Sequence, residues 1–273
     1  MQKRFFYHFF IMALLHSFEK SGNFLFKHRG IVPVFVFLVC LPVLIFSSHY
    51  DYWLWNQTVL RWIIPPVAIL LSLSGIVVRA YTIGTTPHGT SGRNTDKQVA
   101  KSLNTNGIYS IVRHPLYLGN YLMWAGLLVF IANIPFFICV SLIYWLYYER
   151  IMFAEERFLE RQFGQEYLDW SMTVPAFWPR FRQFKKGDVP FHFRSVLRRE
   201  YPGIFAITLC FTLVDYFRAG IFFLYENPCP PEFGNFQWNR LSGIVCVIVF
   251  LAMIVLRTLK HHSKLLAAEE NRD

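Results

Sequence analysis

Charged residues are scarce in this chain of 273 residues. They make up 16% of it, against about 25% in an average soluble domain, whereas hydrophobic residues reach 54%. The shortage of charge argues against a water-soluble globular domain and against a disordered or fibrous chain. The 29 Phe, 14 Tyr and 8 Trp suit lipid contact and interfacial aromatic belts. We therefore predict a polytopic membrane protein.

The sequence also lacks paired cysteines. Its five cysteines form no CxxC pair and no regular framework, so we predict neither a zinc site nor another metal, and no disulfide scaffold. Internal repeats and low-complexity tracts are absent from the sequence as well. The net charge of +10 would suggest nucleic acid in a soluble protein. Here Lys and Arg cluster in particular loops, which indicates membrane topology and anionic headgroups, not nucleic acid.

Six apolar runs approach the roughly 20 residues that a membrane-spanning helix needs. They are Ile31–Ser48, Leu60–Ile83, Leu116–Ala132, Ile134–Tyr148, Gly203–Leu224 and Leu241–Val255. We predict an all-α polytopic transmembrane helical bundle of about six spans. The run Phe5–Leu15 is too short to span a bilayer, so we expect an interfacial helix there, with a signal sequence as the alternative.

Two helix boundaries can be predicted closely. Only Asn133 separates the third run from the fourth, and Pro135 follows it, which predicts a tight helical hairpin. The fourth run has no terminator after Tyr148, so one long helix should project from the membrane to about Phe163, just before Gly164.

Positive charge alternates between the loops. Segments rich in Lys and Arg are 1–30 with five, 84–114 with four, 149–200 with ten and the tail after Val255 with four. The alternate loops, 49–60 and 226–240, carry none and one. By the positive-inside rule, both termini and the two long basic loops lie in the cytoplasm.

These features divide the chain into consecutive segments. We expect an N-terminal cytoplasmic or interfacial segment, two spans, a core that contains the helical hairpin, a basic linker, and an additional hairpin with a tail. In the same order, the segments are 1–30, 31–83, 84–180, 181–200 and 201–273.

A first cluster of unusual residues precedes the third span. Pro115 suits the first turn of a helix, because its missing N–H costs nothing there. Arg113 and His114 then lie at the membrane surface beside a helix N-terminus, a place that favours an anion such as a ligand carboxylate. Alternatively, Arg113 reaches lipid headgroups and His114 caps the helix.

A second cluster, EERFLERQFGQEYLDW, begins at Glu155 on the predicted helical extension and continues past Gly164. Glu156 and Glu160 are like charges four residues apart, and so are Arg157 and Arg161. Such pairs destabilise a helix slightly, so helix stabilisation does not explain the pattern. Such a charged helix is usually a solvated face, and a ligand or the basic loop 84–114 is a plausible alternative partner for these charges.

Together the two clusters resemble a known superfamily. The segment RHPLYLG at 113–119, then EERFLERQFGQEYLDW at 155–170 and VP at 174–175, resembles the isoprenylcysteine carboxyl methyltransferases and phospholipid methyltransferases. The resemblance extends from about Arg79 to Pro175. It implies a membrane-embedded methyltransferase that uses S-adenosylmethionine without a Rossmann domain, which agrees with the absence of a GxGxxG fingerprint from the sequence.

The resemblance also implies a site at the cytosolic surface. Arg113 and His114 are the implied catalytic residues. The implied cofactor-binding residues are Tyr109, Arg113, His114, Pro115, Tyr117, Gly119, Glu155, Glu156 and Tyr167. Two departures affect the comparison. Lys101 stands where many relatives have histidine, and about 98 residues with two further spans follow the VP element, which favours a larger lipid pocket.

The expected substrate is a membrane lipid or a lipid-linked group at the cytoplasmic leaflet. An anionic phosphate or carboxylate needs no general base, whereas an amine must first lose a proton. No buried base besides His114 is evident, so we favour O-methylation of an anionic group over N-methylation of a phospholipid. The membrane would be the cytoplasmic membrane in a bacterium or the endoplasmic reticulum in a eukaryote.

Two other functions fit parts of the pattern. Membrane sterol reductases share a similar RHP…FG…VP layout and take NADPH, whose phosphates Arg93 and Lys101 would suit. A transport or lipid-binding protein without catalysis would be favoured if Asp215 and Arg218, three residues apart in the fifth span, faced a water-filled cavity. A self-neutralising structural pair explains those two residues equally well.

The charge pattern gives a first testable prediction. Single cysteines placed in 96–106 and 180–190 should react with an impermeant reagent only from the cytoplasmic side, and those in 50–58 and 228–236 only from outside. Labelling in intact and in opened cells measures this difference. Labelling of 180–190 from outside would show that the predicted orientation is inverted.

Overall fold

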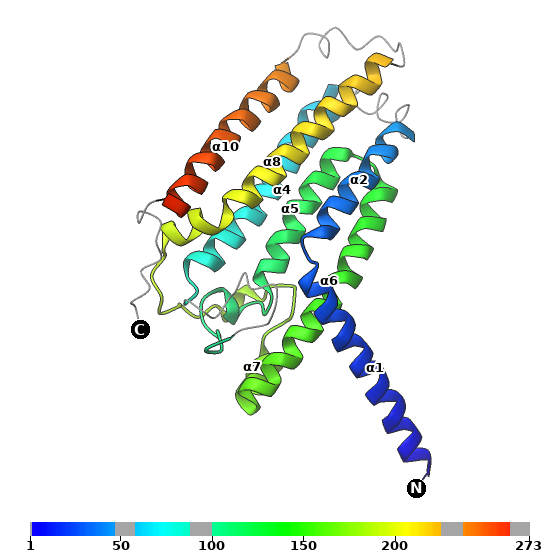
Figure 1. Cartoon of the computed structure of the whole chain (residues 1–273), viewed down its shortest axis with the longest axis vertical. Coiled ribbons are helices and arrows are strands. Elements are labelled where there is room, and N and C mark those ends of the chain that lie inside the picture. The colour runs from blue at the N-terminus through cyan, green and yellow to red at the C-terminus, as the bar shows by residue number, and fades with distance from the viewer. Residues whose placement is uncertain (1, 47–57, 88–99, 225–236, 263–273) are drawn as a thin grey trace. The chain divides into compact units, whose positions relative to one another are not determined.

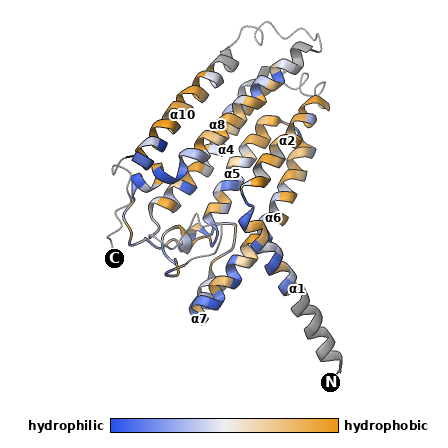
Figure 2. Cartoon of the chain, viewed as in Figure 1, coloured by the Kyte–Doolittle hydropathy of each residue, from blue (hydrophilic) through white to orange (hydrophobic). Residues whose placement is uncertain are grey.

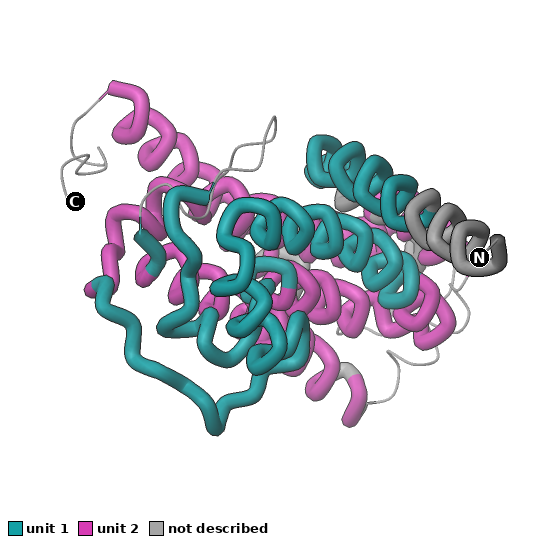
Figure 3. Tube along the Cα trace, turned by 90° about the horizontal axis from the view of Figure 1, so that it is seen from below, with its two compact units in different colours: residues 1–35, 86–117, 140–189 teal, residues 36–85, 118–139, 190–273 magenta. Residues whose placement is uncertain are grey.

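A computed structural model describes residues 2–46, 58–87, 100–224 and 237–262 of the chain (Figure 1). The predicted loops 49–60 and 226–240 lie largely outside these residues. The chain forms two compact units, coloured separately in Figure 3. Unit 1 comprises Met1–Phe35, Thr86–Tyr117 and Val140–Val189, and unit 2 comprises Val36–Thr85, Leu118–Cys139 and Pro190–Asp273. The predicted division into consecutive segments stays a prediction.

Helices form nearly all of the regular structure in the described residues, which confirms the all-α prediction. They are α1 Gln2–Lys27, α2 Ile31–Phe46, α4 Thr58–Gly84, α5 Pro115–Ile131, α6 Ile134–Phe163, α7 Gln165–Thr173, α8 Phe193–Leu224 and α10 Gln237–His262. Two short 3-10 turns, η1 Ile108–Ser110 and η2 Phe181–Gln183, accompany them.

Four of the described helices are long and apolar enough to cross a bilayer. These candidate spans are Trp62–Gly84, Ile134–Phe163, Phe193–Gly220 and Leu241–His262. The two other predicted spans correspond to shorter apolar helices, Phe37–Phe46 and Pro115–Ile131. Figure 2 shows hydrophobic residues over most of α10 and the first part of α6, whereas α7 is largely hydrophilic. A polytopic helical bundle is therefore confirmed, while the count of six spans stays a prediction.

The predicted hairpin and the predicted long helix are both present. Helix α5 ends at Ile131 and α6 begins at Ile134, and the Asn133 side chain caps α6 by accepting the Phe136 N–H at 2.9 Å. Helix α6 then runs without interruption to Phe163. Gly164 follows with φ of +57°, a conformation that favours glycine, and allows α7 to start in a new direction.

Within unit 1, the second half of α1 packs against the last part of α6. The Glu19 carboxylate lies 2.6 Å from the Arg161 guanidinium, and the Tyr147 hydroxyl donates to the Leu25 carbonyl at 3.0 Å. Gly22 lets the two helices approach closely, because a side chain there would overlap the Arg150 carbonyl. The helix predicted around Phe5–Leu15 is thus part of a longer one, and its interfacial location stays a prediction.

Within unit 2, side-chain hydrogen bonds join α8 to neighbouring helices at two places along its length. Arg79 of α4 makes two hydrogen bonds of 2.6 and 2.7 Å to the buried Glu200 of α8 and a third of 2.5 Å to Asn120 of α5. Farther along α8, the Arg218 guanidinium donates to the Phe130 carbonyl at the end of α5, and Asp215 accepts from the Ser242 hydroxyl of α10. These contacts give Asp215 and Arg218 structural roles between helices.

Helices α4 and α5 of unit 2 approach each other closely at small residues. The Ser72 hydroxyl donates to the Met123 carbonyl at 2.9 Å. A Cβ atom on Gly126 would overlap Ser72 and the Ala68 carbonyl, and one on Gly75 would lie 2.8 Å from the Met123 nitrogen. Backbone atoms cannot move aside as a flexible side chain can, so the packing of α4 on α5 requires glycine at these positions.

The packing predicts opposite outcomes for two alanine substitutions. Gly126→Ala should lower the free energy of unfolding by about 1–3 kcal/mol, the typical cost of overpacking. Gly220→Ala in α8 is the matched control, because no atom lies within 4 Å of the added methyl group. It should leave stability unchanged or raise it slightly. Thermal unfolding in detergent measures both, and equal midpoints for the two variants would refute the close packing.

Candidate functional site

The RHP segment of unit 1 is held by a second stretch of chain, residues 175–186, which we call the strap. The N–H groups of Arg113 and His114 donate to the carbonyls of Pro175 and Ala176, at 2.9 and 3.1 Å. Two further backbone bonds, Arg180 to Ile111 at 3.0 Å and Gly107 to Lys185 at 2.9 Å, continue the pairing. The strap therefore fixes the backbone that carries Arg113 and His114.

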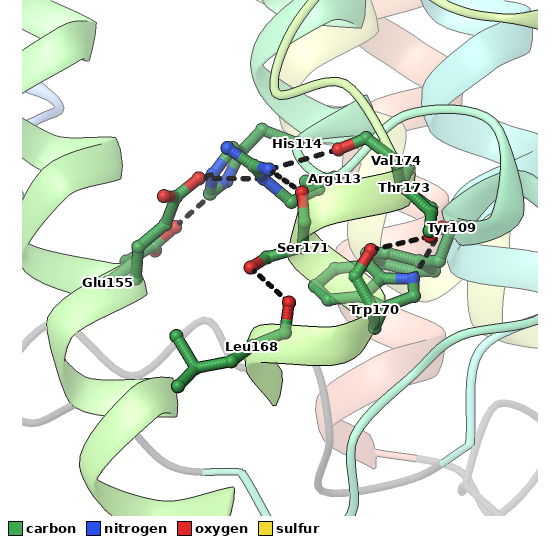
Figure 4. Close-up of polar contacts among 10 residues, drawn as sticks. Tyr109, Arg113, His114, Glu155, Leu168, Trp170, Ser171, Thr173 and Val174 are labelled. Carbon is green, nitrogen blue, oxygen red and sulfur yellow. Dashed lines mark hydrogen bonds and ion pairs between the residues drawn. The ribbon is translucent and has the colours of Figure 1, made fainter. Parts of the chain in front are cut away.

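Arg113 and His114 share one carboxylate on α6. The Arg113 Nε and the His114 Nε2 each lie 2.9 Å from Oε1 of Glu156. Arg113 also donates through Nη1 to the carbonyls of Ser171 and Val174, at 2.5 and 3.0 Å (Figure 4). Because those carbonyls lie at the end of α7, Arg113 fastens α7 to α6 as well as pairing with Glu156.

The other nitrogen of His114 faces the neighbouring carboxylate. Nδ1 lies 3.6 Å from Oε2 of Glu155, so the ring lies between two carboxylates of α6. Burial of the ring favours its neutral form, but the hydrogen bonds and negative charges of Glu155 and Glu156 outweigh burial and raise the pKa of His114 above its usual 6.5. The imidazolium form, with a proton on each nitrogen, matches both contacts.

Tyr117 completes this cluster from the first turn of α5. Its hydroxyl donates to Oε1 of Glu155 at 2.6 Å, and its ring packs against His114 and Tyr148. The side chains of Glu155 and Glu156 remain about a quarter exposed, at 25% and 26%, whereas His114 and Tyr117 are buried. Glu155 and Glu156 are thus the most exposed members of the cluster, ahead of Arg113 at 17%.

Tyr167 of α7 adds a buried hydroxyl to unit 1. Its side chain is buried, and its hydroxyl has no hydrogen-bond partner within the described part of the chain. Burial, followed by the negative charge of Glu156, raises the pKa of Tyr167 well above 10. A buried hydroxyl without a partner is costly, so a ligand with a hydrogen-bond acceptor would suit this position.

The structure brings together most of the predicted site residues. Arg113, His114, Tyr117, Glu155 and Glu156 are in direct contact. Pro115 is the first residue of α5, as predicted, and Tyr109 meets the site through its carbonyl, which accepts from the Trp170 indole at 3.2 Å.

Gly119 has a different setting, in unit 2. A Cβ atom there would lie 2.5 Å from Cγ of Arg79 and 2.9 Å from the Gly75 carbonyl, so packing of α5 on α4 accounts for this glycine. A backbone contact of Gly119 with a cofactor stays a prediction.

Two structural parts of the site were not predicted from the sequence. They are the helix Gln165–Thr173 and the backbone pairing of residues 175–186 with the RHP segment. The available signals were Gly164, which permits a turn between two helices, and the VP element, whose carbonyl accepts the Arg113 N–H. The backbone pairing itself leaves no pattern of residue types.

The cluster suits a ligand that carries positive charge and hydroxyl groups. Two partly exposed carboxylates accept hydrogen bonds from amines and diols, and nearby aromatic rings bind flat or cationic groups. No group of three or more His, Cys, Asp or Glu side chains with metal-binding geometry occurs among residues 2–46, 58–87, 100–224 and 237–262.

Comparison with known proteins gives a family match over the part of the chain that contains these residues. The Phospholipid methyltransferase family matches residues 66–166, a range that includes both Arg113-His114 and Glu155-Glu156. No solved structure shows significant similarity.

Curated relatives fall into two groups. The cobalt-zinc-cadmium resistance protein CzcN of Cupriavidus metallidurans is 31% identical over 166 residues, which cover 60% of this chain and 69% of the relative. The nickel-cobalt-cadmium resistance protein NccN of Alcaligenes xylosoxydans is 31% identical over 166 residues, covering 60% and 70%. Protein-S-isoprenylcysteine O-methyltransferase B of Arabidopsis thaliana is 33% identical over 75 residues, covering 27% and 38%. The chain belongs to the superfamily of isoprenylcysteine carboxyl methyltransferases and phospholipid methyltransferases.

Proposed function

We propose that this protein is an integral-membrane methyltransferase that uses S-adenosylmethionine to methylate a lipid or a lipid-linked group. The observation that carries the proposal is the cluster in which His114 lies between Glu155 and Glu156 while Arg113 shares Glu156. It forms where α5 begins and where α6 becomes charged, next to an apolar stretch in each helix. A polar cofactor and an apolar acceptor can both reach such a place.

The residues fit S-adenosylmethionine by their chemistry. Its amino group and ribose diol are hydrogen-bond donors, which the partly exposed carboxylates of Glu155 and Glu156 would accept. Its sulfonium and adenine suit aromatic rings such as those of Tyr117 and Tyr167. The hydroxyl of Tyr167 would donate to the cofactor. When bound, S-adenosylmethionine supplies a methyl group on a positively charged sulfur.

Arg113 has a positioning role in this proposal. Its guanidinium already donates to Glu156 and to the end of α7, so it holds the carboxylate and Tyr167's helix in place. Methyl transfer is an in-line displacement, whose rate depends on how well donor and acceptor are aligned and on exclusion of water. The chain contributes by fixing the site between α5, α6 and α7.

The protonation of His114 favours an acceptor that is already anionic. Its raised pKa keeps the ring protonated to higher pH, and an imidazolium cannot take a proton from an amine. An ionised phosphate or carboxylate has no proton to lose, so its methylation needs no such base. We therefore propose O-methylation of an acidic lipid group, with N-methylation of a phospholipid as the alternative. The site would face the cytoplasm, with both termini on that side.

The relatives CzcN and NccN are named for resistance to metals, and this provides a competing function. Binding assays on the purified protein separate the two. Our proposal requires binding of labelled S-adenosylmethionine. Binding of cobalt or zinc without S-adenosylmethionine would favour metal handling, and binding of NADPH would favour a reductase.

The site predicts the effects of three substitutions on methyl transfer. Glu156→Ala should lower the rate by about a hundredfold or more, because it removes the group that orients Arg113 and His114 and would bind the cofactor. Arg113→Ala should lower it similarly by releasing α7. Glu166→Ala is the matched control, since Glu166 is exposed on α7, and should keep nearly the full rate.

Transfer of labelled methyl groups to membrane lipid measures these rates, and thermal unfolding shows which variants remain folded. A folded Glu156→Ala protein with normal activity would remove Glu156 from the site.

The acceptor can be identified from the labelled product. After incubation of membranes with labelled S-adenosylmethionine, the lipid extract should contain the label as an ester on an acidic group. Mild base should release it as methanol if the acceptor is a carboxylate. Methylated ethanolamine as the sole product would contradict the anionic acceptor and leave methyl transfer itself supported.

A further inference from the structure

The strap of unit 1 presents a surface that the proposed chemistry does not use. Three of its aromatic side chains are largely exposed: Trp178 at 69%, Phe181 at 72% and Phe184 at 51%. Four exposed basic residues lie among them, namely Arg180, Arg182, Lys185 and Lys186. Exposed aromatic rings interleaved with positive charge are typical of segments that lie in the headgroup region of an anionic membrane.

The strap lies next to the apolar part of α6. Phe177 is buried and packs edge-to-face on Trp145 at 5.4 Å, and Trp178 in turn packs on Phe177 at 5.6 Å. Trp145 belongs to the candidate span Ile134–Phe163 and is itself 41% exposed. A row of aromatic rings thus leads from the spanning part of α6 to the strap. The strap therefore adjoins the part of unit 1 whose helix is apolar enough to span a bilayer.

The strap is held in place by hydrogen bonds that do not involve its exposed aromatic side chains. Its backbone pairs with residues 107–114, and the Gln183 amide and the Lys185 N–H bond to the carbonyl and the hydroxyl of Ser110, each at 2.9 Å. These bonds therefore fix the strap, while Trp178, Phe181 and Phe184 remain largely exposed. An ordered surface of this kind can insert side chains without refolding.

We infer that the strap binds the surface of an anionic lipid leaflet. Trp178, Phe181 and Phe184 enter the boundary between headgroups and acyl chains, and the four basic residues bind lipid phosphates. Because the strap is bonded to the backbone of Arg113 and His114, its insertion sets the depth of the candidate site relative to the headgroups. The inference is independent of methyl transfer, and its test needs no turnover.

The test measures the depth of single fluorescent probes in the full-length protein. Phe181→Cys, and Phe184→Cys as a repeat, carry an environment-sensitive dye in nanodiscs of phosphatidylcholine and phosphatidylglycerol. Glu166→Cys on α7 is the matched water-facing control, and the parent protein taken through the same labelling gives the background. We expect lipids with a shallow nitroxide to quench the probes at 181 and 184 several-fold more than the probe at 166. Aqueous iodide should show the reverse order.

The attraction of the basic residues of the strap to anionic lipid is tested in the same labelled protein. Replacing Arg180 and Arg182 with Gln should reduce quenching by nitroxide lipid in the anionic nanodiscs, whereas replacing both with Lys should preserve it. Nanodiscs of phosphatidylcholine alone should give weaker quenching than the anionic ones. Equal quenching in the two kinds of nanodisc would overturn the preference for anionic lipid.

Two outcomes would overturn the inference as a whole. Strong iodide quenching at 181 and 184, without quenching by lipid, would show that the strap faces water. Protection from both quenchers would show that protein covers it, either a second copy or another partner. These conclusions require that each variant elutes as a single folded species. Agreement between the probes at 181 and 184 shows that the result does not come from a local distortion at one position.

Discussion

The carboxylate of Glu156 accepts hydrogen bonds from Arg113 and His114 at 2.9 Å each, and the other contacts of the site depend on this. A partly buried charge is tolerated only when it is paired and hydrogen-bonded. Through Arg113, Glu156 joins α6 to the end of α7, and through His114 it joins α6 to the start of α5. Loss of this carboxylate would remove one ion pair of Arg113 and one of His114, and would so weaken the links of α6 to α7 and to α5.

The same charges determine which ligands the site accepts. His114 is buried between two carboxylates, and Tyr117 donates to one of them, so the fixed members of the cluster lie inside. The side chains of Glu155 and Glu156, which are about a quarter exposed, favour a cationic ligand with hydroxyl groups. The strap holds the backbone of the RHP segment, and its exposed aromatic and basic residues suit a membrane surface. Cofactor and lipid would then meet at the start of α5 and at the point where α6 becomes charged.

Much of this arrangement could be predicted from the sequence, because local chemistry determines it. Pro115 marks the start of α5, Gly164 marks the end of α6, and the low charge predicts apolar helices. The strap could not be predicted, since its pairing with residues 107–114 uses backbone groups that every residue carries. The packing role of Gly119 was missed for a related reason. A glycine that allows two helices to approach looks the same in sequence as one that faces a cofactor.

The most direct test of the account is binding of labelled S-adenosylmethionine to the purified protein in nanodiscs, compared with a Glu155→Gln, Glu156→Gln variant. These substitutions keep the size of both side chains and remove both negative charges. The account predicts saturable binding by the wild-type protein and its loss in a variant that still elutes as a folded species. Equal binding by the two proteins would contradict the assignment of the cofactor site to this cluster.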